Sequence, residues 1–71
     1  MNREFLGVYQ VAKQRYNLSY SVRYKMDCCI LKIYRDGKLV IMVSDETQER
    51  MYEVAADRLK SYVSLNESSH A

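Results

Sequence analysis

The 71-residue sequence predicts a small α+β domain with two layers in the order α-β-β-β-α. Apolar residues recur at the helical period of 3.6 near both ends of the chain, and in the middle they alternate with polar residues at a period of two. A three-stranded antiparallel meander with both helices on one face buries all of these apolar surfaces at once. Because the length allows only one core, we expect one domain over residues 1–65 and a polar tail over residues 66–71.

The first helix is expected over about residues 3–16. Asn2 can accept a hydrogen bond from the first turn, and five apolar residues then share one side, namely Phe5, Val8, Tyr9, Ala12 and Tyr16. Gly7 weakens this helix by up to about 1 kcal/mol relative to Ala. We therefore expect a close approach at Gly7, by a partner or, preferably, by packing within the fold.

Three strands are expected over residues 18–26, 28–34 and 39–44. In the first, the apolar residues Leu18, Tyr20, Val22, Tyr24 and Met26 alternate with Ser19, Ser21, Arg23 and Lys25. A tight turn near Asp27 leads to the second strand, and residues 35–38 close a hairpin onto the third. This pattern predicts the meander.

The hairpin loop allows two registers. A two-residue turn at Asp36 and Gly37 would place Lys32 in the core, where an unpaired charge is costly. We favour a three-residue loop with Gly37 as a left-handed bulge residue. It places Cys29, Leu31, Ile33, Leu39, Ile41 and Val43 on the inner face. It leaves Ile30, Lys32, Tyr34, Lys38, Val40 and Met42 on the outer face.

The second helix is expected over about residues 46–64. Asp45, followed three residues later by Gln48, resembles a capping box that would begin the helix. Seven apolar residues then follow at helical spacing, namely Met51, Tyr52, Ala55, Ala56, Leu59, Tyr62 and Val63. This stripe predicts the side that packs on the sheet.

Few residues are suited to catalysis or metal binding. The single histidine is His70 in the tail, and the adjacent Cys28 and Cys29 lack the second pair that a zinc site requires. No glycine-rich phosphate loop is present. We therefore expect no enzymatic activity, no cofactor and no metal. The apolar runs are too short for a membrane helix and no leader opens the chain, so we expect a cytoplasmic protein without a membrane partner.

Charge is distributed unevenly along the chain. Residues 1–38 carry eight basic and three acidic residues, whereas residues 39–71 carry three basic and six acidic ones. The net charge of +2 therefore hides a basic first half and an acidic second half. Such a dipole would orient encounters with a charged partner.

The outer sheet face is the predicted binding surface. It would combine an apolar centre with a basic border, and its partner-binding candidates are Arg23, Lys25, Ile30, Lys32, Tyr34, Val40 and Met42. We expect a module that binds a macromolecule, with a protein partner preferred over nucleic acid. One alternative is a nucleic-acid-binding domain in which Tyr34 stacks on a base while Arg23, Lys25, Lys32 and Lys38 contact phosphates. Another is a structural subunit that forms a homodimer through this face.

Two families share features with this sequence. The order α-β-β-β-α over almost the whole chain, with Ala55, Ala56 and Leu59 in the second helix, resembles the double-stranded-RNA-binding domain and implies its fold. The RNA-contacting motifs of that family are absent, because the loop near Asp27 is short and residues 45–49 carry three carboxylates in place of lysines.

The chain also looks like small phage-encoded inhibitors, anti-CRISPR proteins among them. The shared features are the short leading helix, the hairpin over residues 34–38 and the strand that runs directly into the acidic helix start at residues 44–46. This resemblance implies a non-catalytic inhibitor or regulatory adaptor that acts by occluding a surface of its partner.

Overall fold

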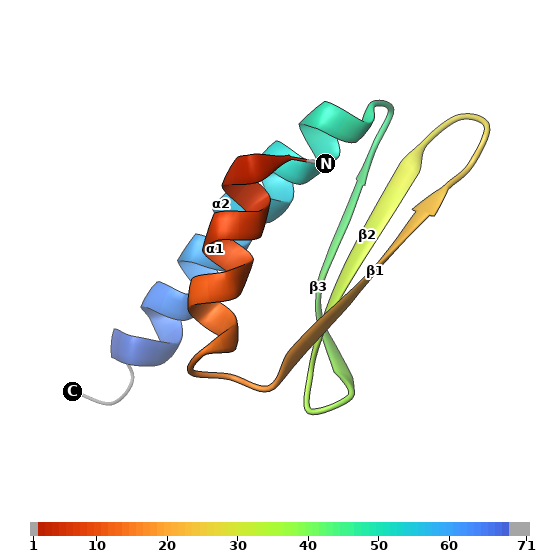
Figure 1. Cartoon of the computed structure of the whole chain (residues 1–71). Helices are drawn as coiled ribbons and strands as arrows, with labels where there is room; N and C mark the ends of the chain where they lie inside the picture. The colour runs from red at the N-terminus through yellow and green to blue at the C-terminus, as the bar shows by residue number, and fades with distance from the viewer. Residues whose placement is uncertain (1, 69–71) are drawn as a thin grey trace.

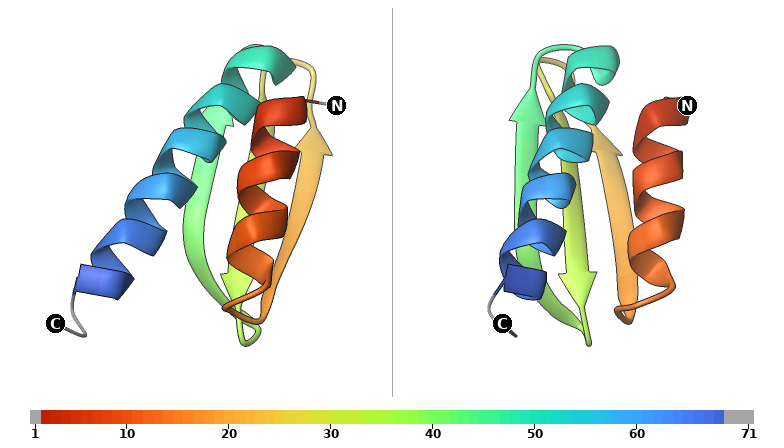
Figure 2. Two further views of the ribbon diagram at one scale, coloured as in Figure 1. Left: turned by 60° about the vertical axis from the view of Figure 1, so that its left-hand side comes forward. Right: turned by 90° about the vertical axis from the view of Figure 1, so that its left-hand side faces the viewer.

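The computed structural model describes residues 2–68 and has the expected order of elements. These are α1 (Arg3–Lys13), β1 (Leu18–Tyr24), β2 (Cys29–Arg35), β3 (Lys38–Asp45) and α2 (Gln48–Ser68) (Figure 1). The strands form one antiparallel sheet in the order β1-β2-β3. Both helices lie on the same side of this sheet and run in the same direction, with α2 over β2 and β3 and α1 toward β1 (Figure 2). The predicted α+β fold is confirmed.

The core lies between the sheet and the two helices. Its fully buried large side chains are Phe5, Leu31, Ile33, Met51 and Leu59. The ring of Phe5 lies 5.3 Å from that of Tyr20 and 5.5 Å from that of Tyr52, measured between ring centroids. The ring of Tyr20 also meets Tyr9 edge-on at 4.8 Å. These aromatic contacts join α1 and α2 to β1, and they involve three of the seven tyrosines of the chain.

The first helix begins as expected and ends earlier. Asn2 Oδ1 accepts a hydrogen bond from the Phe5 backbone N–H at 3.0 Å, which is the predicted N-cap. The helix ends at Lys13, because the following N–H groups of Arg15 and Tyr16 both donate to the Ala12 carbonyl in a tight terminal turn. The expected close packing at Gly7 is wrong, since a Cβ atom placed there would meet no atom within 4 Å.

The β2–β3 hairpin reaches the predicted inner face by a different route. The loop is a two-residue turn in which Asp36 and Gly37 have φ values of 54° and 81°, both left-handed. The extra residue lies in β3 instead, because Tyr34 pairs with Leu39 and Ile33 pairs with Ile41. Val40 is therefore the bulge residue, and the expected bulge at Gly37 is wrong.

This bulge decides which side chains are buried. It keeps five of the six predicted inner-face residues in the core, namely Cys29, Leu31, Ile33, Ile41 and Val43. The sixth, Leu39, lies on the turn side of the bulge opposite Tyr34 and is exposed, so its predicted burial is wrong. Lys32 stays outside the core, as the prediction required.

The second helix begins at Gln48 and ends at Ser68, so both ends lie later in the chain than expected. Thr47 Oγ1 accepts from the Arg50 N–H at 3.3 Å and is the N-cap, whereas Asp45 Oδ1 accepts from the Glu46 N–H at 2.7 Å before the helix begins. The expected capping box at Asp45 is therefore wrong. The helix continues through residues 66–68 of the predicted tail. The rest of that tail, including His70, lies outside the described residues.

Arg35, the last residue of β2, contacts both α2 and the segment that follows α1. Its Nη1 donates to the Tyr62 hydroxyl at 3.2 Å and to Asn66 Oδ1 at 3.3 Å, both on α2. The guanidinium carbon also lies 4.5 Å from the ring centroid of Tyr16, which follows α1. The hydrogen bond to Tyr62 raises the pKa of Arg35 further above its usual value. Asn66 thus belongs to the packed domain.

Candidate functional site

The outer face of the sheet is the face opposite the helices (Figure 1). Strand pairing arranges its side chains in three rows across the strands: Arg23, Ile30 and Ser44; Ser21, Lys32 and Met42; and Ser19, Tyr34 and Leu39. Alternation along the strands therefore brings the predicted residues Arg23, Ile30, Lys32, Tyr34 and Met42 together on this face.

One half of the outer face is a basic depression over β1 and β2. Its volume is about 370 Å³ and it is lined by Ser21, Val22, Arg23, Lys25, Ile30, Lys32 and Tyr34. Five of the seven predicted binding residues are in this set. None of the lining residues is acidic, and Arg23, Lys25 and Lys32 form no ion pair with any residue of the range 2–68. The depression therefore presents three uncompensated positive charges.

The other two predicted residues, Val40 and Met42, belong to an apolar rim. We use β3 rim for the exposed apolar side chains of β3 and the adjoining part of α2, which are Leu39, Val40, Met42 and Leu65 with exposed fractions of 51%, 37%, 52% and 71%. Val40, Met42 and Leu65 line one shallow depression between the strand and the helix. The arrangement therefore differs from the expected apolar centre with a basic border. The cations gather over β1 and β2, whereas the apolar side chains lie on β3 and continue around the edge of the sheet onto α2.

The free edge of β3 is closed to strand addition at one point and distorted at another. Arg58 Nη1 donates to the Met42 carbonyl oxygen at 3.2 Å, so this edge carbonyl is already occupied. The bulge at Val40 interrupts the regular ladder two residues earlier. Both features blunt an edge strand against pairing with another chain. The β3 rim is therefore available through its side chains more than through its main chain.

Three tyrosine hydroxyls, those of Tyr9, Tyr24 and Tyr52, form hydrogen bonds within the fold. The hydroxyls of Tyr24 and Tyr52 are 3.2 Å apart, and burial together with this hydrogen bond raises the pKa of Tyr52 to about 12. Tyr9 donates its hydroxyl proton to the Leu18 carbonyl at 3.1 Å, and burial raises the pKa of Tyr9 as well. The hydroxyls of Tyr9 and Tyr52 therefore stay protonated near neutral pH and contribute to packing and hydrogen bonding.

Within residues 2–68 no three His, Cys, Asp or Glu side chains are placed to hold a metal ion together. Over that range, neither helix combines the length and the apolar character needed to cross a bilayer. Cys29 is buried and Cys28 is half-buried, and each is a free thiol. The outer face presents cations, serine hydroxyls, one aromatic ring and apolar side chains, all of which are suited to binding.

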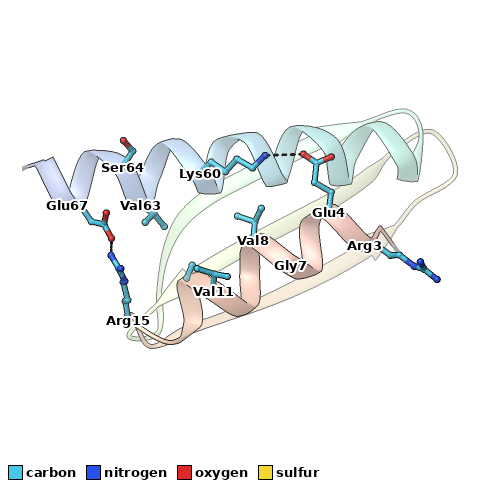
Figure 3. A pocket seen from close by; sticks show the side chains of 11 residues that line it. Arg3, Glu4, Gly7, Val8, Val11, Arg15, Lys60, Val63, Ser64 and Glu67 are labelled. Atoms are coloured by element: carbon cyan, nitrogen blue, oxygen red, sulfur yellow. Dashed lines mark hydrogen bonds and ion pairs between the residues drawn. The ribbon is translucent and has the colours of Figure 1, made fainter.

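A second surface was not anticipated from the sequence. A groove of about 650 Å³ lies between α1 and α2, with Gly7, Val8 and Val11 on one side and Lys60 and Val63 on the other (Figure 3). Sequence reasoning assigned Val8 and Val63 to the core and gave Val11 no role. The signal that could have indicated the groove is Gly7 itself, a helix-weakening residue with an exposed apolar residue one turn later.

Comparison with known proteins finds no matching family model, no similar curated protein and no similar solved structure.

Proposed function

We propose that the protein is a non-enzymatic binding module that holds an acidic partner protein on the outer face of its sheet. The observation that carries this proposal is the combination of a basic depression without carboxylates and an adjoining apolar rim. Charges of one sign steer a partner of the opposite sign and set its orientation. Exposed apolar side chains supply binding energy once water is removed from them.

A protein partner uses both halves of this surface. Burying what remains exposed of Leu39 and Met42 would stabilise a complex by about 1 kcal/mol for each side chain. Tyr34, between Lys32 and the β3 rim, is suited to act as an aromatic anchor. A nucleic acid would engage the cations and leave the apolar rim in water. This difference favours a protein.

The proposed mode of action is occlusion. A small domain with a broad binding face can cover the working surface of a larger protein without any catalytic group of its own. The concrete form of the proposal is a small inhibitor or regulatory adaptor, of the kind that the anti-CRISPR proteins represent. Its support is the same uncovered face.

The experiment is capture of partners from an extract of the native host by the immobilised protein, compared with two variants. Tyr34→Ala combined with Met42→Ser alters the contact between the basic depression and the β3 rim, and we expect it to abolish capture while the circular dichroism spectrum is retained. Met26→Ser is the matched control, since Met26 is fully exposed in the β1–β2 turn and lies outside both halves. Equal capture by the double variant and the parent would show that the outer face is misassigned.

Nucleic-acid binding is a second candidate, favoured by the three unpaired cations around Tyr34. With three phosphates contacted, log K should fall with log salt at a slope of about −2 for a single strand, and Arg23→Glu or Lys32→Glu should reduce both the affinity and the slope. Capture repeated at two salt concentrations, with nuclease in one half of each sample, separates the two candidates. Binding that resists both nuclease and salt would remove the second one.

A further inference from the structure

The groove between α1 and α2 has the chemistry of a contact surface. Val8, Val11, Ala12 and Val63 supply apolar walls, and Gly7 leaves an opening in one of them. Two ion pairs cross the groove near its ends, one from Lys60 Nζ to Glu4 Oε1 at 3.2 Å and one between Arg15 and Glu67 (Figure 3). The groove is therefore an apolar basin enclosed at both ends by charge.

Two residues of α1 are left without a role inside the monomer. Gly7 weakens the helix, and no atom lies within 4 Å of the place where its Cβ would be. Val11, one turn further along the same side, is 62% exposed. Gly7 thus leaves an empty space in the wall of the groove, and Val11 exposes its side chain in the same groove.

We infer that this groove is the interface of a homodimer in which a second copy of the chain lies across it with α1 antiparallel to α1. A two-fold axis that lies in the plane of the interface, perpendicular to α1 and midway between Gly7 and Val11, places Gly7 of one copy opposite Val11 of the other. Val11 of each copy then fills the hollow at Gly7 of the other. Such an isologous contact uses the same patch twice, as a two-fold dimer requires.

The charges at the ends of the groove fit this symmetry. On α1 the groove has Glu4 at one end and Arg15 at the other, and on α2 it has Lys60 at the first end and Glu67 at the second. The antiparallel arrangement brings Glu4 of one copy beside Arg15 of the other. It also brings Lys60 beside Glu67. Four of the five charged residues that line the groove therefore meet a charge of opposite sign, and the fifth, Arg3, extends away from the groove at its end (Figure 3).

The dimer would have a consequence for binding. The helices of the two copies would be enclosed between two sheets, and both outer faces would point away from the two-fold axis. Each assembly would then present two partner-binding surfaces at once, which raises the effective affinity for a partner that carries repeated or symmetric sites.

Sedimentation equilibrium from about 10 µM to about 1 mM tests the inference. We expect the wild-type chain to dimerise. Gly7→Leu fills the hollow that Val11 needs, and overpacking of this kind should raise the dimer dissociation constant at least about tenfold. We expect the monomer to accept this change, because no atom lies within 4 Å of the position that the added Cβ would take. Gln10→Leu, on an exposed position of α1 outside the groove, is the matched control and should leave the constant unchanged.

Two further variants keep the test decisive. Val11→Asp should have an effect as large as that of Gly7→Leu, and Glu4→Arg should weaken the dimer by placing like charge beside Arg15 of the other copy. If Gly7→Leu fails to fold, Gly7→Ala replaces it, with a smaller loss of dimer expected. A wild-type chain that stays monomeric over the whole range overturns the inference. So does a dimer that withstands the Gly7 and Val11 variants but is broken by Met42→Ser, which would place the contact on the sheet.

Discussion

The hydrogen-bonded pair of Tyr24 and Tyr52 makes a sharp prediction about stability at high pH. Tyr52 is buried against Phe5, and its hydroxyl reaches that of Tyr24 at 3.2 Å. Burial is the largest cause of its raised pKa, and the hydrogen bond is the second. Both causes favour the protonated hydroxyl in the folded state. The unfolded chain instead releases this proton near the ordinary pKa of 10.

The direction and size of the effect follow from this difference. The stabilisation is fully present below pH 10 and is lost as the pH rises from 10 toward the folded-state pKa of about 12. A shift from 10 to about 12 corresponds to about 2.7 kcal/mol. Tyr24 is 57% exposed, so water near the pair screens part of this, and we expect a loss of about 1–2 kcal/mol. A chain of this length has a total stability of only about 3–10 kcal/mol.

Urea denaturation between pH 8 and pH 12 measures the effect. Tyr52→Phe keeps the ring and removes the ionisable group, so at pH 8 it should be less stable than the wild type by about 0.5–1.5 kcal/mol and the gap should close above pH 10. Tyr24→Phe removes the hydrogen bond and leaves the burial, so its loss with pH should be intermediate. If the wild type and Tyr52→Phe lose stability in parallel from pH 10 to pH 12, the assigned role of Tyr52 is refuted.

Three further predictions concern local structure. Thr47→Ala should lower the free energy of unfolding by about 1 kcal/mol in urea titrations, and Asp45→Ala by less, because Thr47 is the N-cap; the reverse order would contradict this assignment. Deletion of Val40 should preserve the inner-face register, seen as unchanged cross-strand contacts between Ile33 and Ile41 by NMR, since it removes only the bulge residue. Arg35→Met should speed amide hydrogen exchange in the last turns of α2, and unchanged exchange there would show that Arg35 does not fasten this end.

The inner face of the sheet could be predicted from the sequence, because a buried face requires apolar side chains at every second residue of a strand. Leu31, Ile33, Ile41 and Val43 can share one buried face in only one way, and the structure has that arrangement. The means of reaching it could not be predicted. Asp36 and Gly37 suit either loop, and the extra residue can be accommodated in the loop or in β3. The bulge at Val40 satisfies both the preferred turn and the buried face.

The start of the second helix shows the same limit. Asp45 and Thr47 are both good capping residues two positions apart, so composition alone does not choose between them. Met51 and Tyr52 must both face the core, and this tertiary constraint decides where the helix begins. Local propensity therefore located the boundary only to within a few residues.

The sequence predicted most residues of the candidate site, but it did not predict Leu39 and Leu65 of the β3 rim or the layout of the surface. Alternation assigned Lys32, Tyr34 and Met42 to the outer face, where they lie. It could not show that the cations gather over β1 and β2 while Val40 and Met42 adjoin Leu65 of α2, since that contact joins segments distant in sequence. The groove between the helices was missed for the same reason.

We propose that the partner contacts the outer face of the sheet. Methyl-resolved NMR spectra of the labelled protein, recorded with and without the purified partner, test it most directly. We predict that the methyl signals of Ile30, Val40 and Met42 shift or broaden, while those of the buried Ile33 and of Val8 in the helical groove stay in place. Shifts confined to Val8 and its neighbours, with Ile30 and Met42 unchanged, would contradict the account.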